Sequence, residues 1–306
     1  MSLANDLNWK TSQNVGLVSP FRDGLDASLS LAEADTLNLS AFGVCFSLCA
    51  SQTTLLHEAL LSLPLECKAS FAVSDAPKYS LIHCAESLAN TRPGYRLDLD
   101  GRPLFRCADR TDFLDRFRSV LALHVAEASP IRTFVHAGVV GWGGQAILIP
   151  GRSFSGKTTL VGELVRAGAT YYSDEFAVLD RRGMVYPYAQ PLQIRESGSH
   201  RQTQHPVETL GGTAGTQPLP VGMVVVSQYK PGAQWRPRPL SPGIGLLKLL
   251  DNTVSARRAP AVALSTLKHA VSHATIVRGL RGEASQTVKW IAGHFDASRK
   301  HSGEAE

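Results

Sequence analysis

The sequence predicts an α/β protein of two domains, and three observations indicate this class. Short apolar runs of strand length alternate with stretches of helical spacing along much of the 306-residue chain. A glycine-rich turn at 151–158 joins one such strand to a helix. Near residue 130 a mixed α/β pattern gives way to strands separated by glycine-rich turns. We therefore expect a small mixed α/β domain over 1–130 and a larger domain over 131–306.

In the first domain, apolar residues alternate between the spacing of a strand and the spacing of a helix. A helix after residue 110 is expected to be capped by Thr111, with Asp112 in its first turn, and to end before Ser129-Pro130. The preceding elements are expected to be an apolar stretch at 42–49, a helix at 53–62, strands near 70–73 and 79–83, and a hairpin turn at 98–103.

The second domain begins with a hairpin that leads into the glycine-rich turn at 151–158. The helix that follows is expected to end at Gly168, because glycine is the usual C-cap residue. The other predicted elements are strands at 134–140, 146–149, 170–172, 176–179 and 223–227, a long loop at 197–220, a discontinuous helix over 264–294 and a frayed tail at 297–306.

The composition suits a globular protein with anionic ligands. Hydrophobic residues form 43% of the chain, enough for sizeable cores, and a net charge of +5 favours partners such as nucleotides. Lys and Arg form no stripe interleaved with aromatic residues, so we expect no nucleic-acid partner. No apolar run has the length of a signal-peptide core or a membrane span, so we expect a cytoplasmic protein without a membrane partner.

The cysteines do not indicate a metal site. There are five of them, an odd number, and their spacing lacks the pairs typical of structural zinc. Cys45 and Cys49 are spaced so that they could share one helix face. We expect buried, reduced thiols.

Residues 151–158 match the phosphate-binding loop pattern of a glycine, four free positions and Gly-Lys-Thr. Gly151 and Gly156 allow positive φ angles and a close approach of the backbone to phosphate. Lys157 can reach the terminal phosphates, and the Thr158 hydroxyl can coordinate Mg²⁺. The other loop residues that we expect to bind the nucleotide are Ser153, Ser155 and Thr159.

Two adjacent acids, Asp174 and Glu175, follow a predicted strand 16 residues after Thr158. Transfer of a phosphoryl group requires carboxylates that hold the metal and handle the proton of the acceptor. Asp174 is the expected metal ligand with Thr158, and either acid can serve as the general base. The alternative is a turn with ordinary exposed acids.

The order of several motifs resembles the catalytic domain of HPr kinase/phosphorylase and its kinase-related relatives. The resemblance is strongest over 135–195 and includes His136-Ala-Gly-Val-Val, the loop, Ser-Asp174-Glu175 and Pro-Leu-Gln-Ile-Arg195. It implies a phosphate-loop fold of the kind shared with phosphoenolpyruvate carboxykinase. The chain departs from bacterial HPr kinases at Thr159 and Gln193. It is more similar to the HPr-kinase-like proteins of peptide-maturation systems, such as the lasso peptide type.

The resemblance also implies roles for individual residues. Lys157 and Thr158 would bind the nucleotide and Mg²⁺, and Asp174 with Glu175 would be the metal and base pair. His136 would lie near the transferred phosphate, or it is a strand histidine bonded in the core. Arg195 would face the same phosphate, or it is a solvated charge at a strand end.

These expectations favour an ATP- and Mg²⁺-dependent kinase that phosphorylates a hydroxyl, such as a Ser of a peptide or protein. Two alternatives remain open: a nucleotide-dependent regulatory or assembly protein with slow ATPase activity, and a kinase of small-molecule hydroxyls. The sequence is compatible with a homo-oligomer and does not identify the acceptor.

Overall fold

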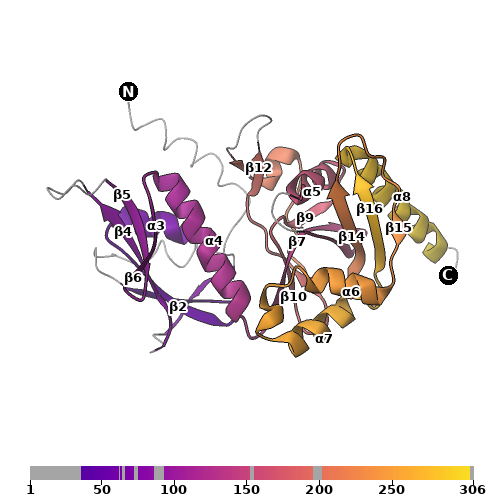
Figure 1. Ribbon diagram of the computed structural model, residues 1–306. Coiled ribbons are helices and arrows are strands. Elements are labelled where there is room, and N and C mark those ends of the chain that lie inside the picture. Colours follow the sequence, from indigo (N-terminus) through magenta and orange to yellow (C-terminus); the bar gives the residue numbers. More distant parts are fainter. Residues whose placement is uncertain are drawn as a thin grey trace, which may run out of the picture. The chain divides into compact units, whose positions relative to one another are not determined.

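The computed structural model describes residues 36–61, 63, 66–71, 75–85, 93–151, 155–195 and 202–303. These residues fall into two compact units, and the chain passes from the smaller to the larger between Ile131 and Arg132, one residue after the boundary expected from the sequence. Both units contain helices and mixed sheets (Figure 1), so the predicted α/β class is confirmed.

The smaller unit contains a six-stranded sheet of order β3-β1-β2-β4-β5-β6. Neighbouring strands are antiparallel except β2 and β4, which run parallel because the chain crosses over between them through α3. The elements are β1 (Leu37–Ala41), β2 (Val44–Ala50), α3 (Thr53–Leu61), β3 (Lys68–Ala69), β4 (Lys78–Cys84), β5 (Gly94–Leu99), β6 (Arg102–Cys107) and α4 (Arg110–Ala128).

Helix α4 packs on this sheet through aromatic side chains. The ring of Phe117 lies edge-on to Tyr79 at 6.3 Å, and that of Phe113 lies 5.5 Å from Tyr95. The helix begins after Asp109, whose carboxylate accepts a hydrogen bond from the Asp112 N–H at 2.9 Å. The predicted cap, Thr111, lies inside the first turn, so that prediction was wrong by two residues.

Other expectations for the smaller unit have mixed outcomes. Asp100 and Gly101 both have positive φ, which closes the predicted β5–β6 hairpin with a tight turn. The strand expected near 70–73 is wrong, since β3 ends at Ala69, while residues 72–73 lie outside the described part of the chain. Cys45 and Cys49 lie on strand β2 and not on a helix, and all five cysteines are free.

The larger unit is built on an eight-stranded sheet of order β11-β10-β7-β8-β14-β16-β15, with β9 paired to β7. Strands β8, β14 and β16 are parallel, and β7 is antiparallel to its neighbours. Its strands are β7 (Thr133–Trp142), β8 (Gln145–Pro150), β9 (Thr170–Ser173), β10 (Phe176–Leu179), β11 (Val185–Tyr186), β14 (Val221–Tyr229), β15 (Arg238–Pro239) and β16 (Thr275–Arg281).

Its helices are α5 (Lys157–Arg166), α6 (Pro242–Leu250), α7 (Pro260–Val271) and α8 (Ala284–Gly303), with short 3-10 turns η1 (Val207–Leu210) and η2 (Val254–Arg257) and a separate hairpin of β12 (Leu192–Arg195) and β13 (Gln202–His205). Helices lie on both faces of the large sheet (Figure 1). On one face Val161 of α5 packs on Gly138 of β7. On the other, Val139 joins a core with α6 and α7. Since alternate strand residues face opposite ways, His136 lies on the α5 side.

Three predictions for the larger unit were wrong in part, and residues 196–201 and 304–306 of the expected loop and tail lie outside the described part of the chain. The loop expected at 197–220 includes β13 and η1. The helix expected over 264–294 is interrupted by strand β16. The tail expected to fray at 297–306 continues α8 as far as Gly303. Among the described residues, no helix combines the length and the apolar character needed to cross a membrane.

Candidate phosphate-binding site

The glycine-rich turn connects the end of β8 to the first turn of α5. Pro150 ends the strand and Lys157 begins the helix, with Gly156 at the cap in the left-handed region at φ 83°. The unpaired N–H groups of this helix end and its dipole favour an anion. Residues 152–154, and with them the predicted ligand Ser153, lie outside the described residues.

Gly151 does not have a positive φ angle, so the expectation of one at this residue was wrong. The glycine instead allows a neighbouring side chain to lie close to the backbone. A Cβ atom at this position would lie 2.6 Å from the Ser155 hydroxyl oxygen. Any larger residue would therefore fill the space into which Ser155 points. Thr159, the last predicted ligand of the loop, is exposed on α5.

The carboxylate of Asp174 contacts the first turn of α5. The Thr158 hydroxyl donates to Asp174 Oδ2 at 3.1 Å. This proximity follows from the sheet, because β9 ends just before Asp174 and β10 begins just after Glu175, and both strands pair with β7. The Ser173 hydroxyl oxygen fixes the turn between them by accepting the N–H groups of Glu175 and Phe176.

Tyr171 holds the other oxygen of Asp174 and was not expected from the sequence. Its hydroxyl lies 3.1 Å from Asp174 Oδ1 and 2.8 Å from the carbonyl oxygen of Gln190, so both acceptors share one donor. Burial, followed by the charge of Asp174, raises the pKa of Tyr171 well above its ordinary value. Tyr171 therefore stays protonated and fixes the orientation of the carboxylate.

Lys157 lies within the electrostatic field of both acids. Burial lowers the pKa of its ammonium group, whereas Asp174 and Glu175 act in the opposite direction. The two carboxylates thus offset part of the effect of burial, and the ammonium group lies at the start of α5, next to the positive end of the helix dipole.

His136 lies on the neighbouring strand, next to this group. Its ring is tilted against Phe176 at 4.6 Å, and its carbonyl oxygen accepts the N–H of Gly151 at 3.2 Å. Burial and then the charge of Lys157 lower the pKa of His136. A neutral imidazole can therefore face the loop at neutral pH.

Arg195 lies on the short hairpin beside α5. It ends β12, a strand that packs against α5, and pairs with Gln202 in the backbone ladder of β12 and β13. Its predicted contact with phosphate stays a prediction.

The described residues contain no cluster of three or more His, Cys, Asp or Glu side chains suited to a metal. A hydroxyl and a carboxylate, as in Thr158 and Asp174, nevertheless match the oxygen ligands of Mg²⁺, which usually keeps several waters and binds phosphate oxygens as well. The pair thus fits Mg²⁺ in its usual partly hydrated form.

Arg281 is a second residue that sequence reasoning missed. It is 2% exposed at the end of β16 and donates from Nη2 to the Gly156 carbonyl oxygen at 2.9 Å. The run Thr275-Ile276-Val277, rich in β-branched residues, could have indicated the strand. Nothing local could have indicated the partner, which lies 125 residues earlier.

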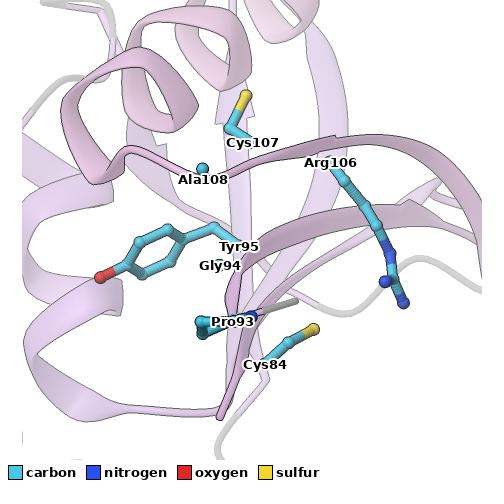
Figure 2. Close-up of a pocket in the computed structure, with 7 residues that line it drawn as sticks. All are labelled: Cys84, Pro93, Gly94, Tyr95, Arg106, Cys107 and Ala108. Atoms are coloured by element: carbon cyan, nitrogen blue, oxygen red, sulfur yellow. The ribbon is translucent and has the colours of Figure 1, made fainter. Parts of the chain in front are cut away.

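A pocket in the smaller unit offers a weaker candidate. Figure 2 shows this hollow of about 190 Å³, lined by Cys84, Pro93, Gly94, Tyr95, Arg106, Cys107 and Ala108. Ligand sites usually span about 300–1,000 Å³. Burial raises the pKa of the Cys107 thiol, so this cysteine is not an activated nucleophile.

No protein family model matches the chain, and no curated protein matches it in sequence. The residues of the site therefore supply the functional argument.

Proposed function

We propose that the larger unit binds a nucleoside triphosphate with Mg²⁺ at the start of α5 and transfers the terminal phosphoryl group to a hydroxyl. The observation that carries this proposal is the 3.1 Å contact between Thr158 and Asp174, which joins the loop to the acidic turn. The sequence resemblance to HPr-kinase-like proteins of peptide maturation favours a Ser of a peptide or protein as acceptor. It also favours a phosphate-loop fold of the carboxykinase kind.

Each residue would then have a separate task. Thr158 and Asp174 would hold Mg²⁺, which when bound neutralises charge on the phosphoryl oxygens. Lys157 would pair with the terminal phosphate. A neutral His136 could donate a hydrogen bond to a phosphate oxygen without adding charge.

Glu175 is the candidate base because Asp174 is already engaged by Thr158 and Tyr171. The acceptor oxygen would form the new bond to the γ-phosphorus while the bond to the bridging oxygen breaks. The nucleoside diphosphate leaves, and Glu175 takes the hydroxyl proton.

The test is an incubation of the full chain with Mg²⁺, γ-labelled ATP and extracts or peptides of its host, followed by a screen for products 80 Da heavier, as expected for added phosphate. Lys157→Ala should abolish transfer, and Lys268→Ala, on the exposed side of α7, should not. Transfer that survives Lys157→Ala would refute the mechanism. Phosphate release without any labelled acceptor would instead favour the regulatory ATPase.

A further inference from the structure

Arg281 brings a buried cation to the back of the phosphate-binding loop. The residue ends β16, which runs parallel to β14 and, through it, to the strand that leads into the loop. Its guanidinium donates to the carbonyl oxygen of Gly156 at 2.9 Å and, more weakly, to that of Ser155 at 3.5 Å. A Cβ at Gly156 would collide with this group, so the loop and the arginine fit closely.

No salt bridge balances the charge of Arg281 within the described part of the chain. None of the ion pairs there includes it, and its buried Nε has no hydrogen-bond partner. Burial lowers the pKa of its guanidinium, although Tyr229 and Glu283 act in the opposite direction. Its guanidinium also lies over the ring of Tyr229, with Cζ 5.6 Å from the ring centroid. A buried cation whose partners are carbonyl oxygens and a ring, and no paired carboxylate, is unfavourable unless an anion compensates it.

The position of Arg281 in the fold adds to the local excess of positive charge. Arg281 lies at the N-terminal end of α5, where the helix dipole is positive, and Lys157 is the first residue of the same helix. Cations usually lie at the opposite end of a helix. The helix dipole, Lys157 and Arg281 thus place positive charge at one helix end, where Asp174 and Glu175 offset the charge of Lys157 but are not among the groups that shift the pKa of Arg281. A chain of phosphates is the ligand class that would balance the charge left at Arg281.

We propose that Arg281 is a positioning residue of the phosphate site, which fixes the Ser155–Gly156 backbone and supplies a second permanent charge for a bound phosphate chain. The inference deepens the proposed function and rests on it. It predicts that the phosphate chain alone, without a nucleobase, is bound.

The test compares Arg281→Gln, which keeps a donor but loses the charge, with Arg281→Lys, which keeps the charge. Arg278→Gln, at an exposed position of the same strand, is the control. The full-length variants are titrated by calorimetry with MgATP, Mg-tripolyphosphate and Mg-pyrophosphate. Arg281→Gln should weaken tripolyphosphate binding about tenfold or more, with a smaller loss for pyrophosphate, and Arg281→Lys should recover part of the affinity.

The outcomes separate the two proposals. If the wild type binds none of these ligands, the proposed function fails. If it binds them and Arg281→Gln binds as Arg278→Gln does, or if Arg281→Gln equals Arg281→Lys, the charge of Arg281 has no role and the inference fails.

If the variants do not fold, an NMR titration of the wild type tests the same inference. In the wild type, the ¹⁵N resonance of the Arg281 Nε–H group should shift on addition of Mg-tripolyphosphate. An unchanged resonance at saturating ligand would overturn the inference.

Discussion

Lys157 lies where opposing influences act on one ammonium group. Burial lowers its pKa and the two acids of the β9–β10 turn raise it. The same lysine lowers the pKa of His136 across the strand. At the scale of residues, the candidate site is thus a coupled set of charges in which a change at one position alters the protonation of its neighbours.

Tyr171→Phe should both destabilise the protein and impair the site. The substitution leaves the half-buried Gln190 carbonyl without its side-chain donor and frees one oxygen of Asp174. We expect a loss of about 1–3 kcal/mol in the free energy of unfolding, measured by denaturant titration, with weaker Mg²⁺-dependent nucleotide binding. Tyr229→Phe, at an exposed position, should change stability by less than about 0.5 kcal/mol. Equal effects of the two substitutions would contradict this account of Tyr171.

His136 should make stability depend on pH on the acid side of neutrality. Its pKa in the folded state lies below the ordinary value of 6.5, so the unfolded chain takes up a proton first as the pH falls. The contribution of the neutral ring is complete above pH 6.5 and is lost as the pH decreases towards the folded-state pKa. Denaturant titrations from pH 7.5 to 5 should therefore show a smaller decrease for His136→Gln than for wild type.

The control for this experiment is His57→Gln, which changes an exposed residue of α3 and should leave the decrease as in wild type. A His136→Gln protein with the wild-type pH dependence would show that the ring titrates alike in both states.

Lys157, Thr158 and the two acids were expected from the sequence because each belongs to a short motif whose chemistry is local. Tyr171 was not expected, because a tyrosine in an apolar strand usually belongs to the core. The partners of its hydroxyl depend on how β9 lies relative to the segment that contains Gln190. Arg281 lies beyond sequence reasoning for the same reason, because its partner is created by the parallel alignment of β8, β14 and β16.

At the scale of elements, the N-termini of the helices show how neighbouring residues compete to be the N-cap. Both Asp109 and Thr111 are suitable N-cap residues, and the structure uses Asp109, two residues before Thr111, with its carboxylate accepting the Asp112 N–H. Gly156 caps α5 without a side chain, so no side chain of the cap residue competes for the N–H groups of the first turn.

Asp109→Ala should destabilise the smaller unit by about 1 kcal/mol, because the Asp112 N–H loses its acceptor. Thr111→Ala, inside the first turn, should have a much smaller effect. Thermal or denaturant unfolding of the two variants measures the difference. A larger effect of Thr111→Ala would contradict the observed cap.

Strand β16 shows why some elements were missed. Its sequence, Thr-Ile-Val-Arg-Gly-Leu-Arg, lies between two helices and contains a glycine, so the surrounding helical periodicity dominated the prediction. The strand forms because it pairs with β14 on one side and β15 on the other, and these are non-local contacts. Strand β13 was missed because its polar sequence, Gln-Thr-Gln-His, resembles a loop.

At the scale of the whole molecule, the two units differ in their cores and in the candidate site residues that they contain. The six-stranded unit has an aromatic core between α4 and its sheet and a small pocket lined in part by Tyr95 and Cys107. The described predicted site residues all belong to the larger unit, where a sheet with parallel central strands carries the loop at its carboxyl edge. The α/β class followed from alternating periodicity, whereas the strand order depended on pairings between distant segments.

The central claim is that Thr158 and Asp174 together bind a magnesium–triphosphate complex at the start of α5. Titration calorimetry of the full chain with ATP, with and without Mg²⁺, tests it most directly. In the wild type, we predict binding heat that requires Mg²⁺. Lys157→Ala should give no binding heat. In Asp174→Asn, the heat measured with ATP should no longer depend on Mg²⁺. The absence of binding heat in the wild type with Mg²⁺, or an unchanged Mg²⁺ dependence in Asp174→Asn, would contradict the claim.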